Sequence, residues 1–285
     1  MEQNLTPVIT PSALIVLTQT TPFILIDARA GTTSEVQYEA THLKGALYVD
    51  LETQLSNKKL DAAEGGRHPL PDPVKFSRVL SELGITQGSH VIVYDDKNAS
   101  NAAARFWWML RAAGHEKVQV VDGGLSASIL AGFPTATGKE KPRVVTSYKI
   151  DKWQLPLVGI NEVTTAVQSE EYLVIDVRDA VRFRGEKEPI DLIAGHIPGA
   201  VNIPFTSNLD QEGFFLSPSE LKENYTRALD NRQSGKVIVH CGSGVTACHT
   251  LLAMAQAGME IPALYIGSWS EWSRNDKPIG TGSGF

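Results

Sequence analysis

The sequence predicts an α/β protein of two tandem domains, each built on a mostly parallel β-sheet flanked by helices. Two observations support this fold class. Short apolar strand patterns alternate with amphipathic helical patterns, such as those at 74–85 and 217–229. Four sequence blocks also recur in the same order in the two halves of the chain, which indicates an internal duplication. Alternation of this kind is typical of parallel sheets covered by helices on both faces.

The repeated blocks set the domain organisation. Residues 23–30 ("FILIDARA") and 173–180 ("LVIDVRDA") are apolar strands that each lead into an Asp-x-Arg motif. The other matched blocks pair 42–51 with 196–205, 89–115 with 235–259, and 118–127 with 263–272. A charged, proline-bearing stretch without helical period separates the two copies. We therefore expect a first domain over 1–140, a linker over 141–156, and a second domain over 157–285.

Composition excludes several classes of partner. The 285 residues include 26 Lys and Arg against 32 Asp and Glu, for a net charge of −6. Without a basic run, neither nucleic acid nor an anionic membrane is an expected partner. The sequence has no apolar stretch near the roughly 18 residues of a membrane span, and its start lacks the features of a signal peptide. These observations predict a cytoplasmic protein.

The two cysteines are expected to be free thiols. Cys241 and Cys248 lie seven positions apart on one loop–helix unit. On a helix this separation corresponds to roughly 10 Å of rise, which is too far for an unstrained disulfide. Free thiols fit a reducing compartment. The cysteines and scattered histidines show no zinc-site spacing, so we expect no metal.

Cys241 lies between a predicted strand at 237–239 and a predicted helix at 246–258. Open α/β sheets place their sites in such loops, at the carboxyl ends of strands. Backbone N–H groups of 242–247 are expected to curl around the sulfur and stabilise a thiolate. The expected binding residues of this loop are Gly242 and Gly244, for their unusual dihedrals, with Val245 and Thr246. A buried structural cysteine is the alternative, but it would not need these glycines.

The first copy has no cysteine at the equivalent place. Asp95 stands there, or Asp96 if the loop is shifted by one residue, and the "DKNASN" sequence that follows lacks the glycines of the second loop. One thiol in a duplicated fold predicts one reactive centre and one supporting domain.

Two nucleophilic chemistries use a strand, a cysteine loop and a helix in this order. Cysteine phosphatases place an arginine six positions after the cysteine to bind phosphate, but this chain has Ala247 there. Phosphatase activity is therefore disfavoured, and sulfur transfer remains.

Over essentially its whole length, the sequence resembles the two-domain sulfurtransferases, the rhodanese and 3-mercaptopyruvate sulfurtransferase family. The resemblance rests on "CGSGVTA" at 241–247, the paired His-x-x-Gly-Ala blocks, "FWWMLRAAGH" at 106–115 and the duplication. It implies two rhodanese-like domains, an inactive first copy, and a persulfide formed on Cys241. Cys-Gly-Ser-Gly-Val-Thr is typical of the mercaptopyruvate branch, whereas thiosulfate-using members typically carry Cys-Arg-Lys-Gly-Val-Thr.

The resemblance also implies roles for residues outside the loop. Arg182 matches the arginine that binds the anionic donor. A second arginine usually follows a Glu-Pro pair, but Ile190 and Asp191 stand in that region, and Arg184 is a candidate substitute. In the mercaptopyruvate branch a histidine and an acid join the loop serine in a relay. Here the relay would consist of Ser243, His68 and either Glu52 or Asp50.

We expect the aromatic stretch at 105–110 to serve packing, while Trp269 is a possible pocket residue. The favoured function is a ping-pong 3-mercaptopyruvate sulfurtransferase that needs no cofactor and whose acceptor is a thiol, cyanide or a thioredoxin-like protein. Two alternatives stay open: a thiosulfate sulfurtransferase, and a non-catalytic persulfide carrier or sensor.

Overall fold

The computed structural model describes residues 5–142, 144 and 146–283. Packing divides the chain into two units. One contains Met1–Ser56, Pro71–Gln154 and Gly213–Phe215, and the other contains Asn57–Leu70, Leu155–Glu212 and Leu216–Phe285. The segment 57–70 therefore belongs to the second unit, although it lies far from it in sequence. Of the expected domains and linker, residues 1–4, 143, 145 and 284–285 lie outside the described part.

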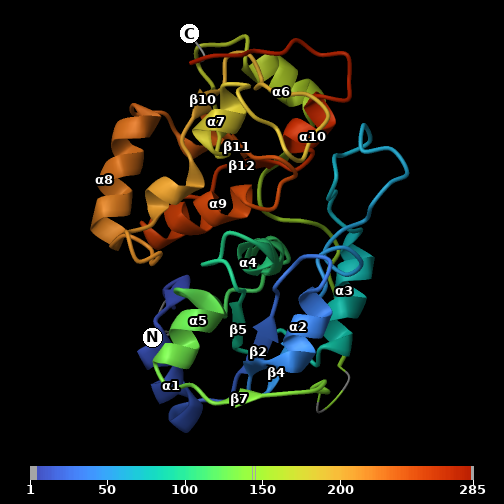
Figure 1. Ribbon diagram of the computed structural model, residues 1–285, viewed down its shortest axis with the longest axis vertical. Helices are drawn as coiled ribbons and strands as arrows, with labels where there is room; N and C mark the ends of the chain where they lie inside the picture. Colours follow the sequence, from blue (N-terminus) through green and yellow to red (C-terminus); the bar gives the residue numbers. More distant parts are fainter. Residues whose placement is uncertain (1–4, 143, 145, 284–285) are drawn as a thin grey trace. The chain divides into compact units, whose positions relative to one another are not determined.

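The first unit holds a five-stranded, fully parallel sheet in the order β1-β6-β5-β2-β4. Its strands are β1 (Val8–Ile9), β2 (Ile24–Asp27), β4 (Ala46–Tyr48), β5 (Val91–Tyr94) and β6 (Val118–Val121). A two-stranded antiparallel pair joins β3 (His42–Leu43) to β7 (Thr135–Ala136). Five helices flank the sheet in Figure 1: α1 (Pro11–Thr20), α2 (Ser34–Ala40), α3 (Pro73–Glu82), α4 (Ala102–Ala112) and α5 (Gly124–Leu130).

The second unit repeats this topology. Its parallel sheet has the order β10-β9-β11-β12-β8. The strands are β8 (Leu157–Val158), β9 (Leu173–Asp176), β10 (Val201–Asn202), β11 (Val237–His240) and β12 (Ala263–Tyr265). The helices are α6 (Ile160–Ala166), α7 (Ala180–Phe183), α8 (Pro218–Leu229), α9 (Ala247–Gln256) and α10 (Ser268–Trp272), with 3₁₀ turns at Phe205–Asn208 and Ser234–Lys236. Read from β8 and β1, the two orders are equivalent, so the duplication and the α/β fold class are confirmed.

The repeated Asp-x-Arg motifs form the same buried ion pair in both units. Arg29 Nη2 lies 2.6 Å from Asp27 Oδ2, and Arg178 Nη2 lies 2.6 Å from Asp176 Oδ2. Each guanidinium also donates to a backbone carbonyl, that of Thr41 in the first unit and of Gly195 in the second. A buried charge needs such full pairing, which explains why the motif occurs in both halves.

The aromatic stretch at 105–110 lies on α4 and packs in the core of the first unit, as predicted. Trp107 and Trp108 are buried, and Phe106 meets the ring of Phe76 edge-on with centroids 5.9 Å apart. Burying rings of this size contributes much of a domain's apolar stabilisation. These side chains therefore do not form a cofactor stack.

Capping residues in the sequence also explain where helices α8 and α3 begin. Helix α8 starts after Ser217, whose Oγ accepts from the N–H of Glu220, while the Glu220 carboxylate accepts from the Ser217 N–H. Helix α3 starts after Asp72, whose carboxylate accepts from the N–H of Val74. Both helices carry proline at the first position, which has no N–H to leave unsatisfied.

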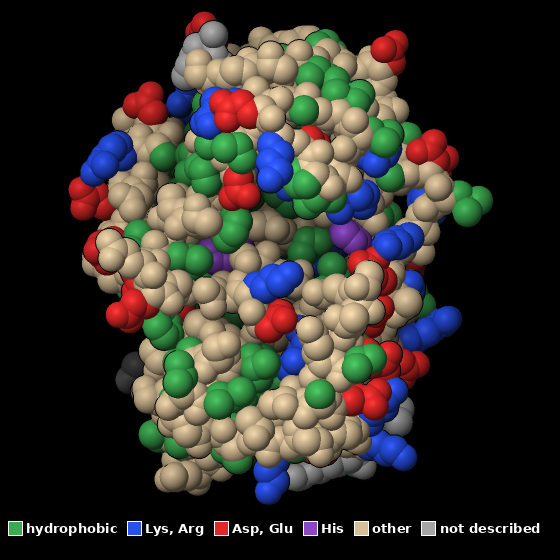
Figure 2. Space-filling model, in the orientation of Figure 1, with side chains coloured by type: hydrophobic (Ala, Val, Ile, Leu, Met, Phe, Trp, Pro, Cys, Tyr) green, Lys and Arg blue, Asp and Glu red, His purple; other side chains and the backbone are tan. Residues whose placement is uncertain are grey.

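Among the described residues, no helix is both long and apolar enough to cross a bilayer. On the face shown in Figure 2, Lys and Arg side chains are interspersed with Asp and Glu. This mixed surface agrees with the modest net charge of −6.

Candidate active site around Cys241

Cys241 is the first residue after β11, and its loop runs directly into α9. Hydrogen bonds from the Gly267–Ser270 region hold the loop. The Cys241 N–H donates to Ser268 Oγ at 3.2 Å, and the Cys241 carbonyl accepts from the N–H of Trp269 at 3.0 Å. The carbonyl of Gly242 accepts from the N–H of Ser270 at 2.8 Å. The cysteine is 3% exposed, so the fold holds it in a fixed, largely enclosed position at the carboxyl end of the sheet.

The two loop glycines are needed for different reasons. Gly244 has φ +71°, and a Cβ there would collide with the carbonyl of Ile266. Gly242 is not among the residues with positive φ, so it does not need glycine for a left-handed backbone. A Cβ on Gly242 would lie 3.1 Å from Nη2 of Arg67 and 3.5 Å from Nη2 of Arg182. Gly242 therefore provides room for two guanidinium groups beside Cys241.

The first unit shows what this type of loop does to an anion. Asp95 follows β5 as Cys241 follows β11, so Asp95 and not Asp96 is the equivalent residue. Its carboxylate accepts backbone N–H bonds from four residues, at 2.9 to 3.2 Å: Lys97, Ala99, Asn101 and Ala103. The first loop therefore forms an amide cradle without glycine, using positive φ at Asn98 (+53°) and Ala99 (+61°).

Burial and these donors act on Asp95 in opposite directions. Desolvation raises the pKa of the buried carboxyl to about 6, and the backbone hydrogen bonds limit the rise. In the second unit, the N–H groups of residues 242, 243, 245 and 246 have no acceptor within the part of the chain that the structure describes. An anion at the loop centre would satisfy such groups.

The segment 57–70 brings two further side chains to the loop. The N–H of Gly65 donates to Glu271 Oε1 at 3.0 Å, and the N–H of Arg67 donates to Ser270 Oγ at 3.0 Å. The side chain of Asn275 also donates to the carbonyl of Ala63, at 2.9 Å. These bonds hold the segment against α10 and the residues after it, so Arg67 and His68 have defined positions.

His68 and Ser243 are brought together. Nδ1 of His68 lies 2.8 Å from Oγ of Ser243, which is 6% exposed. Of the two acids expected near them, Asp50 accepts from the N–H and hydroxyl of Thr53, and from the hydroxyl of Tyr48. Asp50 thus serves a local turn of the first unit. Glu52 lies half-buried in the same turn region.

Arg182 belongs to a cluster of charges centred on the buried Asp191. Arg67 Nε lies 2.9 Å from Asp191 Oδ1, Arg182 Nη2 lies 3.3 Å from Oδ2, and Arg274 Nη1 lies 3.4 Å from Oδ1. Arg182 also pairs with Glu188 at 2.7 Å. Burial would raise the pKa of Glu188, but the bonds from Arg182 and from the backbone N–H of Asp191 outweigh it and lower that pKa.

The expected substitute for the missing arginine is engaged elsewhere. Arg184 pairs with Glu186 at 2.6 Å and is well exposed, while Ile190 is 54% exposed. The guanidinium group that lies beside the loop together with Arg182 is that of Arg67. Trp269, considered as a pocket residue, is fully buried in the core, where its Nε1 donates to the carbonyl of Ile193.

His240 and Cys248 are both buried near the loop of Cys241. Burial lowers the pKa of His240, against the opposing effect of the nearby Asp176, so its imidazole stays neutral. Its Nδ1 donates to the Cys241 carbonyl at 3.2 Å. Cys248 is fully buried and its thiol contacts the carbonyl of Gly244 at 3.4 Å. Neither cysteine forms a disulfide.

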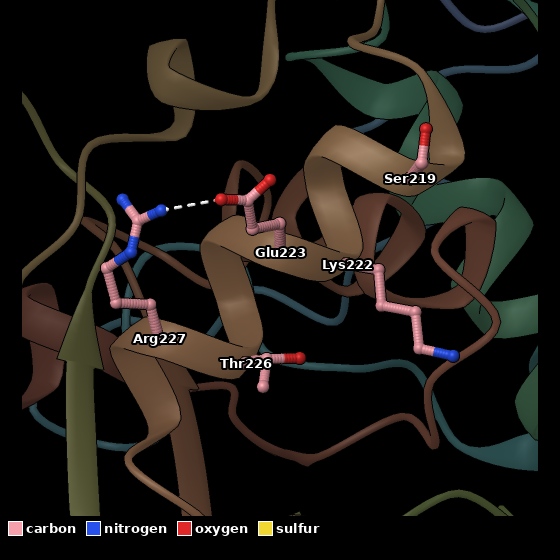
Figure 3. A pocket seen from close by; sticks show the side chains of 5 residues that line it. All are labelled: Ser219, Lys222, Glu223, Thr226 and Arg227. Atoms are coloured by element: carbon pink, nitrogen blue, oxygen red, sulfur yellow. Dashed lines mark hydrogen bonds and ion pairs between the residues drawn. The ribbon is translucent and has the colours of Figure 1, made fainter.

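A hollow on α8 contrasts with this site (Figure 3). It is lined by five side chains of a single helix: Ser219, Lys222, Glu223, Thr226 and Arg227. Its one ion pair, between Arg227 and Glu223 at 2.8 Å, joins side chains that are both 72% exposed. Exposed pairs of this kind contribute little, and neither cysteine nor histidine is among the five lining residues.

Sequence reasoning did not identify Arg67, Arg274 or the hub role of Asp191. The sequence does offer one indication for Arg67, which directly precedes the candidate residue His68 and follows two glycines. Arg274 has no such signal, because its contact with Asp191 joins residues 83 positions apart in the sequence.

Comparisons with known proteins agree with this geometry. A family model described as a rhodanese-like domain matches residues 10–129 and again residues 160–275. A protein of Pseudomonas aeruginosa named "Probable 3-mercaptopyruvate sulfurtransferase" is 40% identical over 86% of each chain. Thiosulfate sulfurtransferase of Rattus norvegicus is 34% identical over 85% of this chain and 80% of its own. The crystal structure of SseA from Escherichia coli, described as a 3-mercaptopyruvate sulfotransferase, is 33% identical with a TM-score of 0.77, covering 94% of this chain and 100% of its own.

Proposed function

The chain belongs to the rhodanese-like sulfurtransferase family and is a sulfurtransferase, and we propose that its sulfur donor is 3-mercaptopyruvate. Sulfur then passes through a persulfide on Cys241 to a thiol or cyanide acceptor. The observation that carries the choice of donor is the hydrogen bond between His68 Nδ1 and Ser243 Oγ, two residues from Cys241. A donor that leaves as an enolate needs a proton source, whereas thiosulfate leaves as sulfite and needs none.

In the proposed first step, the Cys241 thiolate attacks the sulfur of 3-mercaptopyruvate. An S–S bond forms, the C–S bond breaks, and its electron pair passes to the departing carbon as the enolate of pyruvate. The Ser243 hydroxyl protonates that carbon, and His68 returns a proton to the serine oxygen. In the second step a thiolate or cyanide attacks the outer sulfur, the S–S bond breaks, and the Cys241 thiolate is regenerated.

The loop supports the anionic states of this cycle. The N–H groups of Gly242, Ser243, Val245 and Thr246 belong to the loop after β11 and have no acceptor among the described residues. The cradle around the Asp95 carboxylate indicates that this fold can direct amides at a negative charge in the same place. Arg182 binds the donor's carboxylate. Glu52 is the proposed acid of the relay, because Asp50 is occupied by Thr53 and Tyr48.

Thiosulfate is the second candidate donor. Four arginines and three carboxylates form connected ion pairs here and leave one net positive charge near the loop, where a sulfonate would find partners: Arg67, Arg178, Arg182 and Arg274 with Asp176, Glu188 and Asp191. The third alternative, a non-catalytic persulfide carrier or sensor, is not proposed again, because the curated relatives over most of the chain are sulfurtransferases. We also propose a cytoplasmic setting and a thioredoxin-like protein among the acceptors, because free thiols at Cys241 and Cys248 require reducing conditions.

Parallel steady-state kinetics with 3-mercaptopyruvate and thiosulfate test the donor assignment. We expect the higher kcat/KM with 3-mercaptopyruvate and ping-pong kinetics with dithiothreitol as acceptor. Mass spectrometry after donor treatment without acceptor should show one added sulfur on Cys241. Cys241→Ser should abolish turnover, and the matched variant Cys248→Ser should retain it. A higher kcat/KM with thiosulfate, or sulfur added only to Cys248, would overturn the proposal.

A further inference from the structure

We propose that Arg67 is a donor-binding residue that forms, together with Arg182, a two-arginine carboxylate site across Gly242. The inference rests on the proposed function and specifies how the donor's carboxylate is bound. Position 190, where the resemblance leads to the expectation of a second arginine, holds an exposed isoleucine. The second guanidinium beside the loop instead comes from a segment more than a hundred residues earlier in the sequence.

The first step of the inference is location. The Nη2 atoms of Arg67 and Arg182 lie 3.1 and 3.5 Å from the point where a side chain on Gly242 would begin, and Asp191 Oδ2, which pairs with both arginines, lies 3.6 Å from it. Gly242 is bonded directly to Cys241. Both guanidinium groups therefore border the space next to the nucleophile, on the side of the loop that the glycine leaves open.

The second step is availability. Arg67 uses Nε and Nη2 to contact Asp191, and Arg182 uses Nε and Nη2 to contact Glu188 and Asp191. In the described part of the chain, neither residue uses its Nη1 atom in a hydrogen bond. Their side chains are 25% and 14% exposed, so both reach solvent. Two donors in one place can bind a carboxylate at two points, which is the geometry guanidinium groups favour.

The third step is orientation. Asp191 contacts both arginines with the two oxygens of one buried carboxylate, and thereby fixes the spacing of their guanidinium groups. The backbone of Arg67 is held by Ser270 Oγ, and the next residue contacts Ser243. One short segment thus presents a cation to the donor's carboxylate and an imidazole to the hydroxyl that would protonate the leaving carbon. Preorganised groups of this kind lose little entropy on binding.

A first experiment measures anion attraction at the thiolate without any donor. Rates of Cys241 alkylation by iodoacetate and by iodoacetamide are compared, because these reagents are close in size and differ in charge. Their ratio cancels changes in thiol reactivity and access. We expect Arg67→Ala to lower the ratio by about tenfold or more at low ionic strength, with Arg67→Lys between it and the wild type. The matched control is Arg184→Ala, an arginine that is likewise paired with a carboxylate, and it should leave the ratio unchanged.

A second experiment measures turnover with two donors. For Arg67→Ala we expect kcat/KM with 3-mercaptopyruvate to fall by about 10- to 100-fold, mainly through KM. The rate of persulfide formation from mercaptoacetone, which lacks the carboxylate, should change by less than about twofold. A normal melting temperature of each variant shows that the fold is retained.

The outcomes separate the inference from the proposed function. An unchanged alkylation ratio in Arg67→Ala, or equal losses with both donors, would mean that Arg67 only holds Asp191 and the segment, and would overturn the inference. If the wild type fails to turn over 3-mercaptopyruvate but the ratio still falls in Arg67→Ala, the arginine site stands and the donor assignment fails.

Discussion

Nδ1 of His68 lies 2.8 Å from Oγ of Ser243, although the two residues are 175 positions apart in the sequence. An imidazole at hydrogen-bond distance from a hydroxyl can exchange a proton with it, as in other serine–histidine pairs. Because Ser243 is two residues from Cys241, this proton is available where a donor's leaving group would form.

Ser243→Ala should therefore affect the two donors differently. We expect kcat with 3-mercaptopyruvate to fall by roughly 10²–10⁴-fold, the usual contribution of a positioned acid, while thiosulfate turnover changes by much less. His68→Asn should behave in the same way. The double variant should lose little more than either single variant, because both remove one relay. Equal losses with both donors in Ser243→Ala would show that the serine only shapes the loop.

Gly242→Ala and Gly244→Ala should fail in different ways. Alanine at 244 must adopt φ near +71° and meets the carbonyl of Ile266, so we expect a loss of roughly 2 kcal/mol or more in unfolding free energy. Thermal denaturation should show a melting temperature lower by about 4–8 °C. Alanine at 242 meets the side-chain ends of Arg67 and Arg182 at 3.1 and 3.5 Å and Asp191 Oδ2 at 3.6 Å, and no backbone atom, so stability should change much less while KM for the donor rises. Similar melting temperatures for the two variants would refute this distinction.

Asp95 should make stability depend on pH in a definite direction. Its pKa in the folded chain is raised to about 6, above the ordinary value of 3.8, so the folded state holds this proton more tightly than the unfolded state. The stabilisation is fully present below about pH 4 and is lost as the pH rises through about 6. Urea denaturation of the wild type and Asp95→Asn across this range isolates the effect. Relative to the variant, the wild type should become less stable with rising pH, and the opposite slope would contradict the assignment.

The fold was predictable because its signals are local and occur twice. Periodicity predicts helices at 74–85 and 217–229, the structure has them at Pro73–Glu82 and Pro218–Leu229, and the repeated blocks correspond to equivalent strands of the two sheets. The position of Cys241 after a buried strand followed from the same pattern. By contrast, the sequence did not show that Arg67 contacts Asp191, because that pairing depends on how the segment 57–70 packs against α10.

The first-unit loop shows a second limit of sequence reasoning. The sequence predicts an amide cradle only where glycines are present, yet Asn98 and Ala99 adopt positive φ around Asp95. Their strain is offset by four N–H bonds to one carboxylate. A compensating interaction of this kind becomes visible only when the loop geometry is known.

The geometry of the Asp95 loop allows a direct test of whether the first unit can catalyse sulfur transfer. In the variant Asp95→Cys with Cys241→Ser and Cys248→Ser, the single remaining cysteine occupies the cradle formed by the N–H groups of Lys97 to Ala103. Burial outweighs the N–H bonds at the Asp95 carboxyl and raises its pKa, so the thiol in this cradle should react with a disulfide reagent more slowly in the folded protein than Cys241 of the wild type does. Turnover should also stay below about 1% of the wild type, because a cradle alone supplies neither donor binding nor a proton.

The internal duplication shows which donor-binding residue the first unit lacks. Arg182 comes four residues after Arg178, and the residue four positions after Arg29 in the first copy is Thr33. Without that guanidinium, a donor carboxylate has no charged partner of the kind that Arg182 and Arg67 provide beside Cys241. Thr33→Arg in the same background should therefore raise the ratio of iodoacetate to iodoacetamide alkylation at the new cysteine. If the variant with Asp95→Cys, Cys241→Ser and Cys248→Ser, without Thr33→Arg, turned over at a rate comparable to the wild type, the first unit would be a second active centre rather than a support.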